Sequence, residues 1–206
     1  MTTRRTVLTR IFGVTTLLAG ALDGWFNSAA SAQEDKSMSK QAMIDLFKKH
    51  VEAELAGDLD TTMSTMIGEP HLHNVPTMIG GVGYDGVRNF YRDHLVGKFF
   101  SPDVKMTDVS RTVDDHQIVD ELVISFTHTT VIDWMLPGVA PTGKPVEVAF
   151  AVIVGFRDGK ISHEHIYWDQ ASVLVQIGLI DARALPVSGA ESARKILDPT
   201  LPPRQI

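Results

Sequence analysis

The segment that decides the fold spans residues 146–170 and reads VEVAFAVIVGFRDGKISHEHIYWDQ. Its first half is rich in valine, alanine and phenylalanine, and Asp158 and Gly159 separate it from a second half of mixed polarity. An Asp-Gly pair between two such runs is a strong signal for a β-hairpin. The sequence therefore predicts two antiparallel strands, over residues 146–156 and 161–168.

Two earlier segments have the same strand-like composition. Residues 104–112 and 118–134 are rich in valine, isoleucine, threonine and phenylalanine, with a turn at Asp114 and Asp115 between them. A glycine- and proline-containing turn at 137–143 separates this pair from the hairpin. We expect four consecutive strands to form one antiparallel sheet.

Helical periodicity comes before the strands. Residues 40–56 carry apolar side chains at four-residue steps and end at Gly57, which indicates an amphipathic helix. Asp58 can cap a second helix through Ile67 that ends at the turn 68–70, and a third helix is expected from Tyr84 or Asp85 to Val96.

The segment between the second and third helices is less regular. Residues 71–75 alternate and predict a short strand, and we interpret the glycine cluster at 80–83 as a loop. Three early helices followed by strands predict an α+β fold. We expect a curved antiparallel β-sheet that forms a cone-shaped half-barrel, with the three helices packed on it and a pocket at the open end.

The N-terminus resembles an export signal. Residues 1–10 contain three arginines and no acidic residue, and an apolar run of twelve follows at 11–22. The arginine pair in TRRTVL resembles a twin-arginine signal, and ASA at 30–32 offers a cleavage site. An uncleaved membrane anchor is the alternative, but the run is shorter than the roughly 20 residues that span a bilayer.

These boundaries predict four parts of the chain. We expect a signal peptide at 1–32, a flexible leader at 33–39, the cone domain at 40–180 and a C-terminal extension at 181–206. Within the last part of the domain, residues 172–180 indicate a short helical turn, and the extension is expected to wrap on the surface or on a partner.

Charge and cysteine content exclude several functions. The formal net charge is −6, and signal removal would make it about −8, which argues against nucleic acid as a partner. The chain has no cysteine, so disulfides, thiol nucleophiles and thiolate metal sites are excluded. After signal cleavage we expect a periplasmic or secreted protein with no membrane association.

The polar residues of the last strand separate onto two faces. Alternation places His163, His165, Tyr167 and Asp169 on one face, and Glu164 with its apolar neighbours on the other. Two imidazoles, a phenol and a carboxylate can move protons and stabilise an enolate. A solvent-wetted strand face is the alternative for the two histidines.

Other polar residues are candidates for the same site. His71 and His73 form a second His-x-His pair, so four imidazoles on adjacent strands could bind a metal, but the spacing is not specific and we expect none. His128 could line a pocket or be a core histidine with a backbone partner. Trp134 is a candidate for a pocket wall.

Three segments carry a resemblance to a known family. ELAGDLDTTMSTM, LPGVAPTGKPVEV and FRDGKISHEHIYWDQASVLVQIGL occur in this order over residues 40–179. They resemble the nuclear transport factor 2-like superfamily, in particular its SnoaL-like polyketide (ester) cyclase branch. The resemblance implies a curved sheet around a pocket, commonly a homodimer through the sheet, and acid–base catalysis without metal or organic cofactor. His165 departs from the family pattern, in which many relatives have tryptophan.

We therefore expect an exported, cofactor-independent cyclase, isomerase or lyase that acts on a small hydrophobic carbonyl compound or lactone. Asp169 is the predicted general base, with His165 and His73 as proton donors or oxyanion stabilisers. The remaining predicted substrate-binding residues are Tyr167, His163, Trp134 and His128. The alternative is a non-catalytic periplasmic module that uses the same pocket for ligand binding or assembly.

The signal sequence gives a direct prediction. The chain isolated from the periplasm or the medium should begin at Gln33, because cleavage is expected after Ala32. N-terminal sequencing checks this, and an intact Met1 on the exported protein would contradict it.

Overall fold

A computed structural model describes residues 38–204 of the chain. The expected signal peptide and almost all of the expected leader lie outside the described residues. No helix within the described part is long and apolar enough to cross a membrane.

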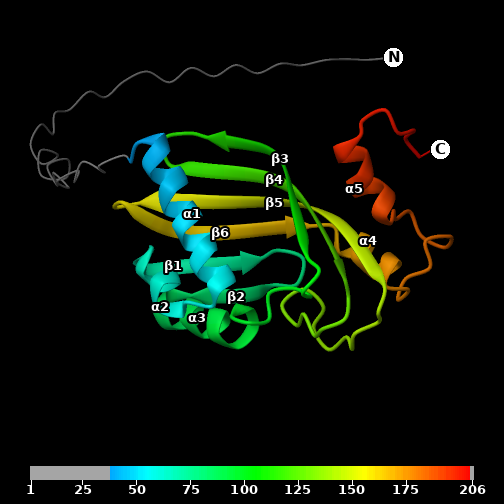
Figure 1. The fold of residues 1–206 in the computed structure, drawn as a ribbon, viewed down its shortest axis with the longest axis horizontal. Helices are drawn as coiled ribbons and strands as arrows, with labels where there is room; N and C mark the ends of the chain where they lie inside the picture. Colours follow the sequence, from blue (N-terminus) through cyan, green and yellow to red (C-terminus); the bar gives the residue numbers. More distant parts are fainter. Residues whose placement is uncertain (1–37, 205–206) are drawn as a thin grey trace, which may run out of the picture. The chain divides into compact units, whose positions relative to one another are not determined.

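Six strands form one curved, open sheet (Figure 1). The strands are β1 (Met66–Asn74), β2 (Ile79–Val82), β3 (Lys105–Val113), β4 (Gln117–Thr127), β5 (Pro145–Arg157) and β6 (Lys160–Trp168). Their order in the sheet is β2-β1-β6-β5-β4-β3, and all pairs are antiparallel except β1 with β6. The fold is therefore the predicted α+β class, with one parallel pair that the sequence did not predict.

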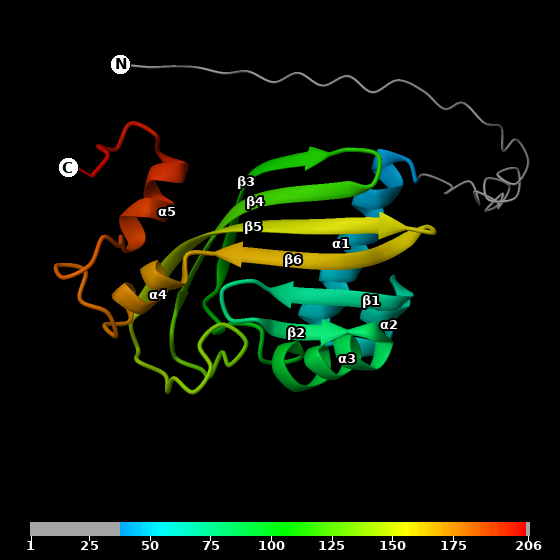
Figure 2. The same ribbon diagram turned by 180° about the vertical axis from the view of Figure 1, so that it is seen from behind.

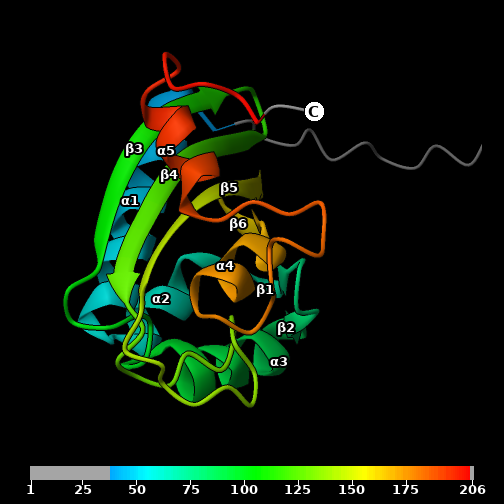
Figure 3. The same ribbon diagram turned by 90° about the vertical axis from the view of Figure 1, so that its right-hand side faces the viewer.

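Helices occupy one face and one end of the sheet. They are α1 (Lys40–Ala56), α2 (Leu59–Ser64), α3 (Gly83–Phe90), the π-helix η1 (Tyr91–Leu95), α4 (Gln170–Gln176) and α5 (Ala190–Leu197). α1 crosses one face of the sheet, as opposite views in Figures 1 and 2 show. Figure 3 shows the sheet curving from β3 round to β2.

Local signals set the ends of the first two helices. The Ser39 side chain accepts a hydrogen bond from the backbone N–H of Ala42, and Gly57 ends α1 with a φ of 70°. The Asp58 side chain then accepts from the N–H of Thr61 and begins α2. The bounds of α1 and the cap of α2 at Asp58 agree with the sequence prediction. α2 stops at Ser64, before the expected Ile67, because the chain enters β1 at Met66.

The residues predicted as a turn after α2 are part of a strand. β1 runs through Gly68, Glu69 and Pro70, and its register with β6 shifts between Met66 and His71. Proline has no N–H to donate to a ladder, so it is tolerated where pairing is irregular. The irregular pairing explains why turn-forming residues occur here without ending the strand.

The glycine cluster predicted as a loop is also largely a strand. Ile79 to Val82 form β2, which pairs with β1. A Cβ on Gly81 would lie 2.4 Å from backbone atoms of Gly86 in α3. Glycine is therefore required because α3 packs directly against the backbone of β2.

The long strand expected over 118–134 is shorter than predicted. β4 ends at Thr127, and the following loop buries the side chains of Ile132, Trp134, Met135 and Leu136 completely or nearly so. Buried loops and buried strands are both rich in apolar residues. Composition alone therefore placed the end of the strand at residue 134 instead of Thr127.

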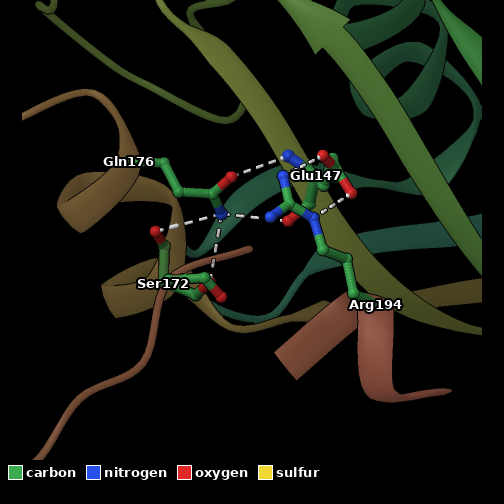
Figure 4. A network of polar contacts seen from close by, with 5 residues as sticks. Glu147, Ser172, Gln176 and Arg194 are labelled. Atoms are coloured by element: carbon green, nitrogen blue, oxygen red, sulfur yellow. Dashed lines mark hydrogen bonds and ion pairs between the residues drawn. The ribbon is translucent and has the colours of Figure 1, made fainter. Parts of the chain in front are cut away.

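The C-terminal extension contains a helix that packs on the sheet. Arg194 of α5 forms an ion pair with Glu147 of β5, and the Gln176 side chain bonds both the backbone N–H and the C=O of Glu147 (Figure 4). Gln176 also donates to the Ser172 hydroxyl, which donates to the Gly189 carbonyl. These bonds hold α4 and the start of α5 against β5.

The contact between α3 and β2 gives a stability prediction. Gly81→Ala should lower the free energy of unfolding by about 1–3 kcal/mol, because the added methyl group overlaps the Gly86 backbone. Gly68→Ala in β1 is the matched control, since nothing lies within 4 Å of its Cβ position. Urea denaturation of both variants checks this, and equal stability of the two would contradict it.

Candidate active site

A cavity of about 310 Å³ lies between α1 and the face of the sheet that α1 covers. Most of its wall is apolar. The apolar lining consists of Ile44, Phe47, Val51, Leu72, Phe90, Leu95, Phe99, Phe100, Met106, Leu122, Ile124, Trp134, Phe150, Val152 and Ile166. A concave, mainly apolar site with few polar groups is typical of sites for small hydrophobic ligands.

Two glutamates line the cavity among these apolar side chains, and a buried histidine contacts both of them. His50 Nε2 is 2.9 Å from Oε1 of Glu164 in β6 and 3.1 Å from Oε1 of Glu54, one turn further along α1. The Tyr91 hydroxyl lies 3.0 Å from the same Nε2 and donates to Glu164 Oε2 over 3.4 Å. Both glutamates line the cavity, and the His50 side chain is completely buried.

The hydrogen bonds of Thr65 determine which His50 nitrogen carries a proton. Thr65 Oγ1 donates to the carbonyl of Thr62 over 2.5 Å, so its hydrogen is already used. His50 Nδ1 lies 2.6 Å from the same oxygen and must therefore donate to it. Because Nδ1 carries a hydrogen, Nε2 is the nitrogen that gains or loses the second proton in front of the two carboxylates.

The charges around His50 favour that second proton. Burial alone would lower the pKa of His50, but the negative charges of Glu164 and Glu54 outweigh it and raise this pKa to about 10. Burial likewise raises the pKa of the Glu54 carboxyl group, against the lowering effect of His50. Burial also raises the pKa of the Tyr91 hydroxyl, so Tyr91 stays a hydrogen-bond donor.

The network has more oxygens than one N–H can satisfy. Three oxygens, from Glu164, Glu54 and Tyr91, lie within 3.1 Å of Nε2, which carries one hydrogen. Burial raises the pKa of the Glu54 carboxyl group, so it takes up a proton more readily than an exposed glutamate. One imidazole, two carboxyl groups and one phenol therefore form a polar cluster beside an apolar cavity.

The π-helix brings Tyr91 into this network. The N–H of Val96 bonds to the carbonyl of Tyr91 five residues earlier, over 2.8 Å. This wider turn follows α3 directly and occurs where the fully buried Tyr91 meets His50 and Glu164. Single π-turns inserted after α-helices are frequent at functional sites.

A second polar group lies at the rim of the cavity. Arg111 of β3 forms a two-pronged ion pair with Asp120 of β4, at 2.6 Å for both contacts, and its guanidinium lies 5.8 Å from the Phe47 ring centre. Lys48 and Glu52 also line the cavity, and their side chains are exposed. The cavity lining therefore includes solvent-exposed charged residues as well as the shielded carboxyl groups of Glu54 and Glu164.

The structure places the predicted site residues of β6 on the face away from the cavity. The strand alternates as expected, but Glu164 and Ile166 line the cavity, whereas His163, His165 and Tyr167 lie on the opposite face. These three residues, predicted as catalytic or substrate-binding, therefore do not contact the cavity. The cavity wall is mainly apolar, and the more polar face of β6 is the outer one.

The other predicted residues are distributed as follows. The Asp169 side chain accepts from the N–H of Ser172 and caps α4, and it does not line the cavity. His73 of β1 lies on the outer face beside His165. His128 is fully buried outside the cavity lining, with Nδ1 3.2 Å from Thr142 Oγ1, and burial lowers its pKa.

Of the predicted residues, Trp134 is the one that lines the cavity, where its ring stacks with Phe99 and its Nε1 donates to the Phe99 carbonyl. The catalytic roles assigned to Asp169, His165 and His73 stay predictions. They are not used in the site described above.

Sequence reasoning missed the buried acid–base network. His50 and Glu54 occur one turn apart on the amphipathic first helix, and this i, i+4 pair beside an apolar stripe was the available signal. Glu164 shares its strand face with Ile166 and Trp168, a pattern typical of a face that packs on other elements. The contact between residues 50 and 164 depends on tertiary structure, which neither local pattern contains.

The same residues offer ligand atoms for a metal. Atoms of His50, Glu54 and Glu164 all lie within 4.8 Å of one another. Nitrogen and carboxylate donors of this kind suit zinc or iron. Because the pKa of His50 is raised to about 10, its Nε2 carries a proton at neutral pH. That proton occupies the space between the ligand atoms of the three residues.

Comparison with known proteins identifies the family. The family model described as SnoaL-like polyketide cyclase matches residues 36–177, which is more than half of the chain. The chain belongs to the SnoaL-like polyketide cyclase family. No match to it was found among curated proteins.

Solved structures agree on the fold of this SnoaL-like protein. A "putative SnoaL-like polyketide cyclase" from Jannaschia sp. CCS1 is 16% identical, with a TM-score of 0.53, covering 72% of this chain and 99% of that one. TsrD from Streptomyces laurentii is 16% identical, with a TM-score of 0.52 and coverage of 69% and 99%. An NTF2-like protein from Burkholderia xenovorans LB400 is 11% identical, with a TM-score of 0.52 and coverage of 68% and 99%.

The His50 network predicts how stability depends on pH. The pKa of His50 is about 10 in the folded chain and about 6.5 when unfolded. Its contribution is fully present below pH 6.5 and is lost as pH rises toward 10, because the unfolded chain releases this proton first. The free energy of unfolding should fall by a few kcal/mol over this range, at about 1.4 kcal/mol per unit of pKa difference.

His50→Gln should flatten this dependence, whereas His116→Gln, at an exposed turn, should not. Urea denaturation at several pH values measures it. Identical slopes for the wild type and His50→Gln would contradict the assigned charge state.

Proposed function

We propose that this SnoaL-like protein is an acid–base enzyme of cyclase or isomerase type that acts on a small hydrophobic carbonyl compound or lactone. The observation that supports this is the pair of glutamates, the buried Glu164 and the largely shielded Glu54, in the wall of a mainly apolar cavity. Two acids held in different protonation states within one site are a recurring basis for acid–base chemistry at neutral pH.

The two glutamates have complementary roles in this proposal. The Glu164 carboxylate accepts a proton from the carbon beside the substrate carbonyl, and the electron pair of that C–H bond forms the enolate. The Glu54 carboxylic acid donates its proton to the oxygen on which negative charge develops. In a cyclisation, the enolate carbon attacks a second carbonyl of the same molecule, and that oxygen takes the proton.

His50 keeps the charge of the site constant during this exchange. As Glu164 becomes neutral, Glu54 becomes a carboxylate, and both lie within 3.1 Å of the same Nε2. The imidazolium therefore changes its partner without moving, and no uncompensated charge appears in the apolar wall. Preorganised charge of this kind costs no reorganisation during the reaction.

The remaining cavity wall orients an apolar substrate. Phe99, Phe100 and Trp134 pack against one another and offer aromatic surface on one side. Asn74 of β1 lines the cavity, donates to the Ile79 carbonyl through its Nδ2, and has a buried Oδ1 without a hydrogen-bond partner among the described residues. A polar group on the substrate would satisfy this amide.

The proposal includes the cellular setting that the sequence favours. We propose export through the twin-arginine route to the periplasm or the medium, and assembly as a homodimer. The arginine pair and apolar run of residues 1–22 support export, and the family resemblance supports a dimer. The acidic net charge supports a small-molecule substrate over nucleic acid.

A non-catalytic ligand-binding module is the second candidate. The apolar lining of the cavity would serve binding alone. Such a module would bind hydrophobic ligands and show no difference in proton exchange between the wild type and glutamine variants of the two buried glutamates. The experiment below therefore separates the two candidates.

Replacement of the cavity glutamates should remove proton transfer. With 2-tetralone and related hydrophobic ketones in D₂O, the wild type should exchange the α-protons, and Glu164→Gln should slow this exchange by about 10²–10⁴-fold. Glu54→Gln should slow the reaction of substrates whose carbonyl oxygen must take up a proton during enolisation or cyclisation. Proton NMR measures the exchange, and near-UV circular dichroism verifies folding.

Glu52→Gln is the matched control on the same helix, because the Glu52 side chain is exposed at the cavity rim. It should keep the wild-type exchange rate. Unchanged rates in folded Glu164→Gln and Glu54→Gln would contradict the proposed catalytic roles.

A further inference from the structure

Four histidines lie together on the outer face of the sheet, away from the cavity. The parallel pairing of β1 with β6 places His71 beside His163 and His73 beside His165. Figure 2 shows β1 and β6 from behind the sheet, with no described helix in front of them. All four side chains are half-buried.

Two of the imidazole rings are close enough to share a ligand, and the other two are their neighbours. His71 Nε2 and His165 Nε2 are 3.0 Å apart. The ring of His163 is stacked on that of His71 at 4.9 Å and lies 4.8 Å from that of His165. His73 lies edge-on to His165 at 6.5 Å. When two nitrogens each bind one metal ion at about 2.0–2.1 Å, the distance between the two nitrogens is similar to the 3.0 Å between His71 Nε2 and His165 Nε2.

A glycine on the flanking strand β5 gives one of these rings room. Gly155 of β5 is in register with His163. A Cβ on Gly155 would lie 2.0 Å from Cε1 of His163, so the imidazole lies directly over the glycine. Any larger residue at 155 would displace the ring from the cluster.

The cluster consists of imidazoles without a paired carboxylate. Among the described residues, the histidines that form ion pairs with carboxylates are His50 and His94, which lie outside the cluster. The ligand atoms that this face offers are therefore imidazole nitrogens, which suit zinc, copper and nickel.

We propose that these four histidines form a binding site for a divalent transition-metal ion on the outer face of the sheet. His71 and His165 supply the first two nitrogens through Nε2. His163 and His73 supply further nitrogens after rotation of their half-buried rings. A ligand set of imidazoles selects copper, nickel or zinc over magnesium or calcium.

The site joins the two strands of the parallel pair. One ion bound by His71 and His165 links β1 to β6, whose register is irregular between Met66 and His71. From the sequence we expected no metal, because two His-x-His pairs are not specific for one. The register that brings residues 71 and 165 together is the observation that the structure adds. The site is independent of the proposed acid–base chemistry, since its residues face away from Glu54 and Glu164.

Metal titration of the untagged protein tests this proposal. The chain should be stripped with a chelator, dialysed, and titrated with Zn²⁺ and Cu²⁺ by calorimetry at pH 7.5. We expect one ion per chain, tighter binding of Cu²⁺ than of Zn²⁺, and a higher melting temperature with Zn²⁺. His71→Ala and His165→Ala should each weaken Zn²⁺ binding at least tenfold and remove the rise in melting temperature.

Two control variants locate the ion. His116→Ala removes an exposed histidine of the β3–β4 turn and should leave the affinity unchanged. Glu164→Gln should also leave it unchanged, because Glu164 faces the cavity. Absence of binding, unchanged affinity in both His71→Ala and His165→Ala, loss of binding in Glu164→Gln, or one ion shared between two chains would each overturn the proposal.

Discussion

The buried contact between His50 and two glutamates fixes the first helix to the sheet. Through this imidazole, α1 meets β6 at Glu164, the end of α2 at Thr65 and the π-helix at Tyr91. Charges in a low-dielectric interior are stable only when they are paired and hydrogen-bonded, and removing one partner typically costs about 3–5 kcal/mol. The position of α1 across the sheet, and with it the existence of the cavity, therefore depends on a polar contact as well as on apolar packing.

The cavity combines this polar contact with an apolar surround. The curved sheet and α1 supply aliphatic and aromatic walls, whereas the ion pair of Arg111 with Asp120 lies at the rim. Glu54 and Glu164 are shielded from solvent, whereas the interactions of the exposed charged residues are screened by it. The low local dielectric raises the pKa of Glu54, and perturbed acids of this kind are common in sites of acid–base chemistry.

The two faces of β6 show how one strand can serve two environments. Glu164 and Ile166 face the cavity, and His163 and His165 face outward next to the histidines of β1. Cavity-facing and outward residues are adjacent in sequence, so the period of two separates the proposed proton-transfer site from the proposed metal site by the thickness of the sheet. The parallel register of β1 with β6 supplies the second half of the histidine cluster.

Local sequence patterns were enough to predict the class of fold, the first helix with its end at Gly57, and the hairpin turn at Asp158-Gly159. These features follow from local periodicity, capping and turn chemistry, which act over a few residues. Tertiary structure alone decided which face of β6 meets the cavity. Alternation divides a strand into two faces without saying which is covered, and His50 meets Glu164 only because α1 packs across the sheet on that side.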